Sequence, residues 1–345
     1  MSFPNLQPGE WYEIPNSNLS SVLPSPLPPG ATGPSAIVTA WNGALYDSKR
    51  SRHVLMVAGG HGDYAGNEVY SFDLVRWSRI WGPTTNAQIP GVTAAGTETY
   101  LDGMPASRHT YSGVQYLPGV DAYFVHGGSL WGGSGGMGKG TWLFGDRGWQ
   151  RRADISTNSA VPFTVYDPAN GQVYVHRYNV LYAYDVASNT STKIGGHPQG
   201  ISPLGTSVFD PIRRRFFLIG GGTRMYDMNT PPGNIQLQTI TTTGDKTAEN
   251  AKYPGAEYDP MTDTICCWAG GGAVYDLSPN FNWTKINPTN TVTPAAPPST
   301  GTHSRWRYMS DNNLFIVTSS INANVNLYRH GGKAPRGVTN LEVRQ

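Results

Sequence analysis

Histidine, arginine and tyrosine residues follow several apolar runs of this 345-residue chain, and such side chains can bind sugars or acids. Arginine binds carboxylates bidentately, aromatic rings pack on apolar sugar faces, and histidine can transfer a proton. Taken singly, each residue could equally satisfy loop carbonyls. The candidate binding residues are His61, Asp63, Tyr64, Arg108, His109, His126, Trp131, Arg177, Tyr178, His303 and Arg305.

Some of these residues are of the types that a polysaccharide lyase uses. Such an enzyme needs a histidine or tyrosine base to remove the proton beside a uronate carboxylate, and an arginine to neutralise that carboxylate. The residues of these types are His109, His126, His176, Arg177 and Tyr178. Because eight histidines are spread along the chain, some will lie together by chance, so residue types alone do not establish catalysis.

Other chemical motifs are weaker, and we expect neither a metal nor a cofactor. Residues 133–140, GSGGMGKG, place Gly140 where a phosphate-binding loop needs Ser or Thr, and no helical pattern follows. His61 and Asp63 are too few ligands for a metal site by themselves. The adjacent Cys266 and Cys267 would point to opposite faces of a strand, so they form no disulfide with each other, and without a second cysteine pair a structural zinc cluster is not expected.

Composition indicates a globular protein made of short strands. The chain is 38% apolar, contains 42 Gly and 27 Pro, and has only 14% charged residues, a balance that disfavours helices. A net charge of +2 without a long basic run excludes nucleic acid as an expected partner. No signal peptide is recognisable at the start, and no apolar stretch is long enough to cross a membrane.

Six apolar runs recur along the chain and must position the candidate residues. They are HVLMVAGG (53–60), AYFVHGG (122–128), QVYVHRY (172–178), RFFLIGGG (215–222), TICCWAGGG (264–272) and NLFIVTSS (313–320). A strand with a polar turn, in several copies Asp-Pro, precedes each run, and a strand marked by Tyr or Trp follows it. This periodicity predicts repeated antiparallel units.

Paired glycines after a buried strand, then an aromatic strand and a Trp, resemble the kelch repeat of the galactose oxidase and kelch-like superfamily. The clearest copy is residues 54–77; the copy around His176 lacks both glycines, and Ser319 and Ser320 replace them in the last. The resemblance implies an all-β, six-bladed kelch-type β-propeller. Seven blades are the alternative, because residues 82–105 are long enough to conceal part of a blade.

The last unit lacks a fourth strand, and residues 10–14, EWYEI, have the pattern of the missing one. Pairing it into the last blade would close the ring and remove exposed sheet edges. We therefore expect a leader at 1–35, a propeller at 36–330 and a C-terminal arm at 331–345. The expected blades are 36–82, 107–152, 160–196, 205–241, 254–287, and 303–330 with 10–14.

The predicted fold gathers the candidate residues on one face. In a four-stranded blade, the loop between strands two and three and the connection to the next blade lie on the same side. The candidate residues fall in these segments or at the starts of inner strands, so we expect them around the axial opening.

Two enzyme classes that share propeller folds are not expected. Galactose oxidase needs a Cys cross-linked to a Tyr, a second Tyr and two His, whereas Cys266 and Cys267 lie inside a strand that cannot readily present them at the axis. Sialidases carry repeated Ser-x-Asp-x-Gly-x-x-Trp boxes, which are absent from this sequence.

The Pro-rich segment 23–33 and the stand-alone propeller are similar to bacteriophage tail or capsid-surface components. We expect a non-enzymatic structural and binding module that contacts other virion proteins and a surface glycan or receptor. It would reside in the virion if phage-encoded and otherwise in the cytoplasm. The alternatives are a polysaccharide lyase or other carbohydrate-active enzyme, and a cytoplasmic protein–protein adaptor.

Overall fold

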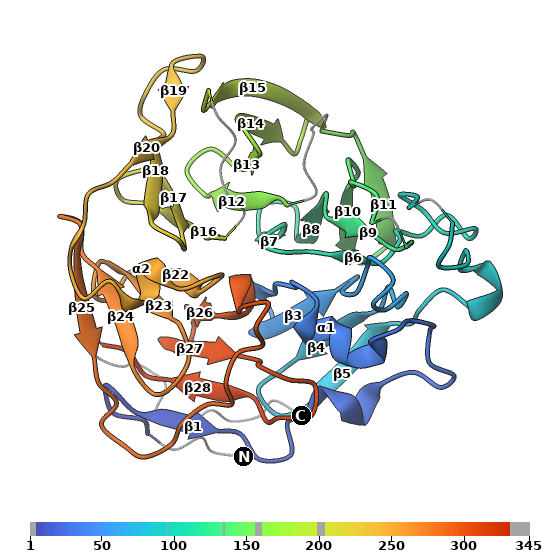
Figure 1. Cartoon of the computed structure of the whole chain (residues 1–345), viewed down its shortest axis with the longest axis horizontal. Helices are drawn as coiled ribbons and strands as arrows, with labels where there is room; N and C mark the ends of the chain where they lie inside the picture. Colours follow the sequence, from blue (N-terminus) through green and yellow to red (C-terminus); the bar gives the residue numbers. More distant parts are fainter. Residues whose placement is uncertain (1–4, 95, 134, 156–160, 199–203, 332–345) are drawn as a thin grey trace.

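The structure is a computed structural model that describes residues 5–94, 96–133, 135–155, 161–198 and 204–331. It is a six-bladed β-propeller, in which six sheets surround a central axis (Figure 1). This confirms the predicted fold class. Apart from Gly331, the expected C-terminal arm lies outside the described residues.

The chain forms the blades in order around the ring. Blade 1 contains β2 (Leu45–Asp47), β3 (Arg52–Met56), β4 (Val69–Phe72) and β5 (Trp77–Trp81). Blade 2 contains β7 (Val114–Leu117), β8 (Ala122–His126), β10 (Thr141–Gly145) and β11 (Gly148–Arg152). Blade 3 contains β12 (Phe163–Asp167), β13 (Gln172–Arg177), β14 (Val180–Asp185) and β15 (Thr190–Gly196), and β19 (Ile235–Gln236) extends it in parallel.

The second half of the ring repeats this plan. Blade 4 contains β16 (Thr206–Asp210), β17 (Arg215–Ile219), β18 (Thr223–Asp227) and β20 (Gln238–Thr239). Blade 5 contains β22 (Gly255–Asp259), β23 (Thr264–Trp268), β24 (Val274–Leu277) and β25 (Asn282–Ile286), and β21 (Thr243–Gly244) extends it in parallel. Blade 6 contains β26 (Arg307–Met309), β27 (Leu314–Val317), β28 (Asn326–Tyr328) and β1 (Trp11–Glu13).

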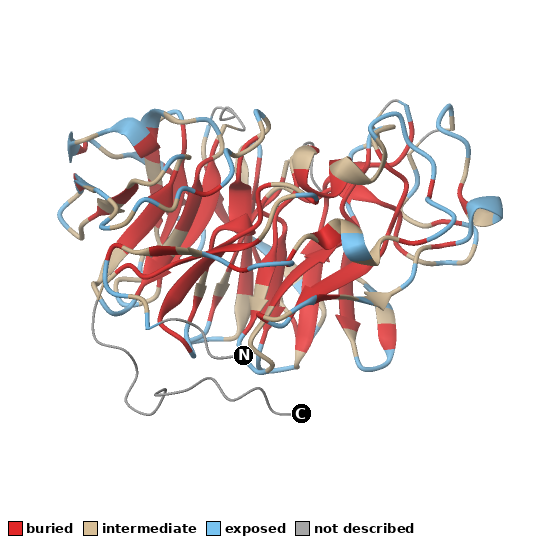
Figure 2. Ribbon diagram, turned by 90° about the horizontal axis from the view of Figure 1, so that it is seen from below, coloured by how far each residue is buried: buried red, intermediate tan, exposed pale blue. Residues whose placement is uncertain are grey.

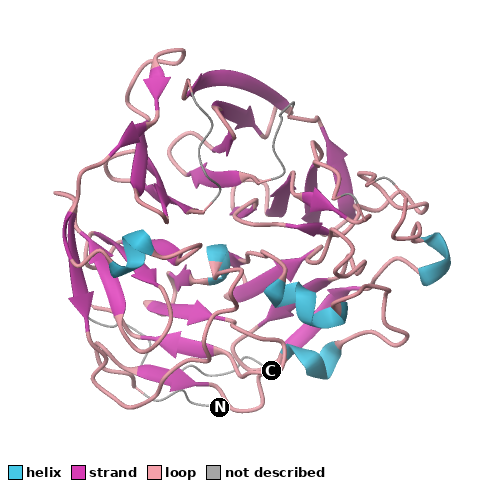
Figure 3. Cartoon of the chain, viewed as in Figure 1, coloured by secondary structure: helices cyan, strands magenta, loops and turns pink. Residues whose placement is uncertain are grey.

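Helices are short and lie in the connections between sheets (Figure 3). They are the α-helical turns α1 (Ala36–Thr39) and α2 (Thr247–Asn250) and the 3₁₀ turns η1 (Leu19–Val22), η2 (Gly33–Ser35), η3 (Asn86–Gln88) and η4 (His303–Arg305). A small ribbon pairs β6 (Arg108–His109) with β9 (Ser129–Leu130). In the described part of residues 82–105, η3 occurs and no sheet strand, so this segment adds no seventh blade. No helix of the described part is long and apolar enough to cross a membrane.

The N-terminal strand closes the ring. Strand β1 pairs antiparallel with β28, with Trp11 opposite Tyr328. The Trp11 ring is 1% exposed and its centroid lies 4.7 Å from that of Tyr328, 5.7 Å from Trp306 and 6.1 Å from Trp268. Its Nε1 donates a hydrogen bond to the Gly272 carbonyl at 2.8 Å. The predicted closing strand is thereby confirmed, and its Trp11 side chain also contacts blade 5.

The apolar runs form second strands because these strands are covered on both sides. Val54, Leu55 and Met56 in β3 are all buried, although successive side chains point to opposite faces. One face packs toward the preceding blade and the other toward the following one, so both must be apolar. Figure 2 shows buried strands through the disc and exposed residues mainly in the loops.

Ion pairs join neighbouring blades on the face that carries the turns between first and second strands. Arg50 of blade 1 bonds Asp121 of blade 2, and Arg213 of blade 4 bonds Asp263 of blade 5. Arg214 also pairs with Asp167 of blade 3 at 2.8 Å. We call this side the lower face and the opposite side the upper face.

Candidate functional site

Four aromatic residues on the upper face occupy the same position before the inner strands of four blades. They are Trp41, Tyr111, Tyr253 and His303, with φ values of 51°, 47°, 52° and 51°. This left-handed region is unfavourable for bulky side chains and costs on the order of 1–3 kcal/mol for each residue. Strained backbone of this kind concentrates at functional sites, so its repetition around the axis directs attention to this opening.

The rings of these residues meet around the axis. The centroids of Tyr253 and His303 are 4.8 Å apart, and those of Tyr111 and His303 are 5.7 Å apart. Trp41 lies 5.2 Å from His109, whose ring is 6.0 Å from that of Tyr111. The mouth cluster consists of Trp41, His61, Asp63, His109, Tyr111, Tyr253 and His303.

A carboxylate orients one imidazole of the mouth cluster. Asp63 Oδ2 lies 3.0 Å from His109 Nε2, and Asp63 Oδ1 accepts a hydrogen bond from Thr32 Oγ1 at 2.6 Å. The hydrogen bond from His109 is the largest cause of a lowered pKa for Asp63. An ionised Asp63 can only accept, so Nε2 of His109 carries the proton.

His109 is therefore arranged as a base. Burial lowers its pKa and outweighs the neighbouring Asp63, which favours the neutral ring near neutral pH. Its other nitrogen, Nδ1, has no hydrogen-bond partner among the described residues, and the side chain is 3% exposed. The exposed His61 packs edge-on against the same ring at 5.8 Å.

The loop that presents Asp63 depends on close backbone packing. Gly60 has φ 80°, and a Cβ at this position would lie 2.3 Å from the Ser129 carbonyl oxygen and 2.6 Å from the His109 nitrogen. The loop is closed by hydrogen bonds from Gly60 N to the Tyr64 carbonyl and from Asp63 N to the Gly60 carbonyl. A glycine after the buried strand thus brings the loop against β6, where His109 lies.

His303 has a similarly fixed ring. Its Nε2 donates to the Thr300 carbonyl at 3.0 Å, and its Nδ1 is buried without a partner. Burial is the main cause that lowers its pKa to about 3, and Arg305 acts in the same direction. Two neutral imidazoles of the mouth cluster therefore each retain an unpaired nitrogen.

Four other sequence-predicted residues hold the surrounding loops. Tyr64 donates to Glu68 at 2.7 Å, and Trp131 Nε1 donates to the Pro90 carbonyl at 2.8 Å. Arg108 is buried against Glu98 and the Gly127 carbonyl. Arg305 donates to the carbonyls of Asn42, Gly301 and Thr318, which links blade 6 to the entrance of blade 1. These contacts stabilise the opening.

The remaining sequence-predicted residues form a separate group near blades 2 to 4. Arg177 Nη1 donates to the Gly138 carbonyl at 2.6 Å and lies 3.2 Å from His126 Nε2. His176 Nδ1 is 2.7 Å from the Tyr226 hydroxyl, whereas Tyr178 is half exposed. Within the described residues, no hydrogen bond or ring contact joins this group to the mouth cluster. The structure thus separates His109 from the other lyase candidates.

The sequence analysis missed a ring of aromatic residues at the lower face. One from each blade lines a cavity of about 470 Å³: Tyr46, Tyr116, Tyr166, Phe209, Tyr258 and Tyr308. Arg307 lies deeper in the channel, where it binds Glu257 at 2.7 Å and donates to the carbonyls of Ala44 and Val114. The repeated aromatic residue before each turn was the available signal, but these segments were interpreted only as strands that end in turns.

Comparison with known proteins adds no family assignment. No protein-family model matches the sequence, and no curated protein matches it significantly. One solved structure that resembles the chain is described as a novel fungal alcohol oxidase of the AA5 family in complex with copper. It is 16% identical with a TM-score of 0.49, and the match covers 83% of this chain but only 60% of that protein.

This comparison corrects the expected function. The sequence analysis predicted a non-enzymatic structural module of a bacteriophage virion, whereas the solved structure described above is an enzyme. That prediction is wrong. Alcohol oxidation and copper binding remain properties of the other protein.

The residues of this chain do not fit a cysteine–tyrosine copper centre at the axis. Cys266 and Cys267 are both fully buried in β23, inside blade 5. The mouth cluster contains neither of them. Burial raises the pKa of both thiols well above the ordinary value, which keeps them protonated. No reaction step through copper follows from this arrangement.

Proposed function

We propose that the chain is a carbohydrate-active enzyme that cleaves an acidic polysaccharide by elimination at the mouth cluster. The observation that carries this proposal is the Asp63–His109 hydrogen bond of 3.0 Å, which leaves Nδ1 of a neutral imidazole without a hydrogen-bond partner among the described residues. A carboxylate that fixes the tautomer of a histidine is a recurrent arrangement for proton abstraction.

Tyr111 supplies the complementary acid. Its ring lies 6.0 Å from that of His109, and burial is the main cause that raises its pKa, so the phenol remains protonated near neutral pH. In the proposed reaction, His109 Nδ1 takes the proton beside the uronate carboxylate. The electrons of the broken C–H bond form a carbon–carbon double bond as the glycosidic C–O bond breaks, and Tyr111 protonates the departing oxygen.

Elimination fits this site better than hydrolysis by two carboxylates. Glycosidases of that kind use a pair of Asp or Glu residues. The mouth cluster has one carboxylate, Asp63, which already binds His109 and Thr32. Half-buried Trp41 beside His109, and half-buried Tyr253 beside His303, offer aromatic surface for packing against a sugar.

We also propose that the blades are kelch-type repeats. Gly60 with positive φ, buried Tyr70 and buried Trp77 of blade 1 support this. Trp77 Nε1 donates to the Ser17 carbonyl at 2.9 Å, so the tryptophan that ends the repeat pattern also holds the leader.

His109→Ala is expected to reduce eliminative cleavage by about 10²–10⁴-fold, because general base catalysis contributes rate enhancements of this order. Asp63→Asn should also reduce it, since the amide no longer fixes the tautomer with a negative charge. The measurement is the ultraviolet absorbance of the unsaturated product, followed for a panel of uronate-containing polysaccharides and neutral ones.

Asp146→Asn is a matched control, because the Asp146 side chain is 91% exposed on the lower face. It should retain wild-type turnover. Equal turnover in wild type and His109→Ala would contradict the assignment of the base. Absence of unsaturated product from every uronate polysaccharide would contradict the reaction.

A further inference from the structure

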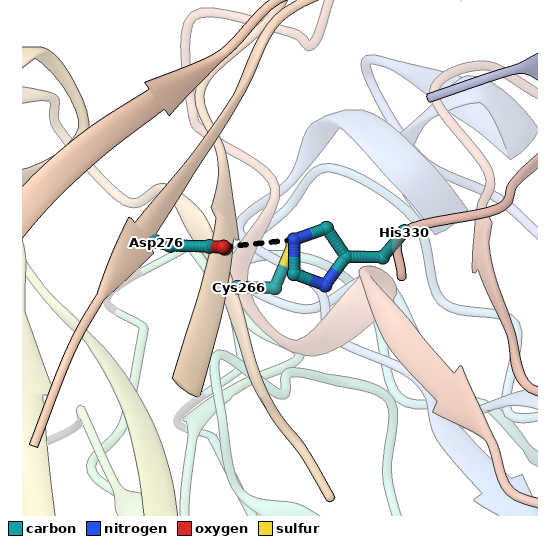
Figure 4. Close-up of side chains that lie close together, drawn as sticks. All are labelled: Cys266, Asp276 and His330. Carbon is teal, nitrogen blue, oxygen red and sulfur yellow. Dashed lines mark hydrogen bonds and ion pairs between the residues drawn. The ribbon is translucent and has the colours of Figure 1, made fainter. Parts of the chain in front are cut away.

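A buried group of thiol, carboxylate and imidazole lies between blades 5 and 6. Cys266 comes from β23, Asp276 from β24, and His330 follows β28; one potential ligand atom from each lies within 4.8 Å of the others (Figure 4). His330 Nε2 is 2.9 Å from Asp276 Oδ2, and its Nδ1 is 2.6 Å from Asp259 Oδ2. Neighbouring strands of blade 5 thus meet an imidazole that lies more than 50 residues later in the sequence.

This group has unused ligand atoms. Asp276 Oδ1 and the Tyr328 hydroxyl are buried without hydrogen-bond partners. Tyr328 is fully buried, and its ring centroid lies 6.1 Å from that of His330. Orphaned oxygen atoms beside a thiol and two carboxylates form an environment that favours a cation.

Two other blade junctions are joined by arginine. Arg50 bonds Asp47 and Asp121 of blades 1 and 2, and Arg213 bonds Asp210 and Asp263 of blades 4 and 5. Between blades 5 and 6, His330 bonds Asp259 and Asp276, two carboxylates of blade 5. Arginine has no lone pair to give a metal, whereas histidine and cysteine are the common ligands of zinc.

We propose that Cys266, Asp276 and His330 form a structural Zn²⁺ site that fastens blade 6 to blade 5. The ion would take Sγ of Cys266, Nε2 of His330 and a carboxylate oxygen of Asp276. A water molecule or the second oxygen of Asp276 completes a tetrahedral shell. Binding displaces the thiol proton and the Nε2 proton, so two protons are released for each ion.

The donor set selects zinc over harder cations. Magnesium and calcium prefer shells of oxygen ligands, whereas one sulfur, one nitrogen and one oxygen suit zinc. Asp259 orients the ligand His330. Its hydrogen bond to Nδ1 fixes the tautomer in which Nε2 can bind the ion. The sequence analysis sought a second cysteine pair and therefore overlooked this mixed set.

The site is tested by titrating Co²⁺ and Zn²⁺ into chelator-treated full-length protein. We expect about one equivalent of Co²⁺, with a thiolate-to-cobalt charge-transfer band that Zn²⁺ displaces, and a higher Tm on addition of Zn²⁺. The Asp259→Asn variant should bind about 10–100-fold more weakly, because it removes only the partner that orients His330.

Cys267 provides a matched control. It neighbours Cys266 in β23 but points to the opposite side, into the apolar cluster between blades 4 and 5. Cys266→Ser should lose the charge-transfer band, and Cys267→Ser should keep it. No metal binding by the wild type, or the same band in Cys266→Ser, would overturn the proposal even if one variant folds poorly.

Discussion

Replacing Trp11 by alanine is expected to lower the free energy of unfolding by about 3–5 kcal/mol. The side chain is almost completely buried against three aromatic rings and donates a hydrogen bond to the Gly272 carbonyl. Its removal leaves a cavity at the junction where β1 completes blade 6. Urea unfolding followed by fluorescence and circular dichroism gives the change.

Glu13→Ala tests whether the effect belongs to the anchor or to any change in the strand. Glu13 is exposed on the same strand and accepts a hydrogen bond from Asn324. We expect a change within about 0.5 kcal/mol for this control. Deletion of residues 1–15 should expose the edge of β28 and promote aggregation. Equal stability of the Trp11→Ala variant and the wild type would contradict the closing role of β1.

Stability is expected to fall steeply as the pH drops from about 6.5 toward 4. Burial is the main cause that lowers the pKa of each of His53, His176 and His303 to about 3, whereas an unfolded chain has histidine pKa values near 6.5. Between these values the unfolded state binds more protons, so acid favours unfolding. With three such groups, the free energy of unfolding falls by about 4 kcal/mol for each unit that the pH is lowered.

Other groups change the slope of the free energy of unfolding against pH without reversing its sign. Burial also lowers the pKa of His109 and His126, which act in the same direction. Burial raises the pKa of Glu68, which acts in the opposite direction through a single proton. The measurement is the urea midpoint at a series of pH values between 4 and 6.5, which should fall strongly as the pH is lowered across this range.

His53→Phe offers a sharp control for the origin of the slope. Both ring nitrogens of His53 are buried without partners, so the replacement removes a titrating group and no hydrogen bond. Arg305 and Arg307 contribute to its low pKa. The variant should lose about a third of the slope that these three histidines provide. A slope that is unchanged in the variant, or flat in the wild type, would contradict the explanation.

The fold could be predicted from the sequence because the same physical constraint repeats six times. The centres of second strands, such as 54–58 and 216–219, are apolar throughout, since both of their faces are covered by neighbouring blades. The strand around Trp11 was recognisable by its likeness to residues 282–286, and its pairing with β28 follows from the need to close the ring. Tandem repetition makes such a pattern visible without an alignment.

The site was harder to predict, because a residue type does not show where its side chain points. Arg108, Arg177 and Arg305 suggested anion binding, yet their guanidinium groups bind backbone carbonyls within the ring. The strained positions of Trp41 and Tyr253 left no mark in the sequence, because a left-handed backbone at an aromatic residue is imposed by the surrounding fold. Within the described residues, His109 contacts two other predicted residues of the mouth cluster, Asp63 by a hydrogen bond and His61 by a ring contact.

Pairing of β1 with β28 also determines the order in which the molecule can be completed during synthesis. Trp11 leaves the ribosome 317 residues (328 − 11) before its partner Tyr328. At about 5–20 residues per second, the first strand waits roughly 15–60 s for its place. The nascent chain must keep this apolar tryptophan from other contacts during that interval. Ribosome-bound chains that end before blade 6 should therefore recruit chaperones that bind exposed apolar segments.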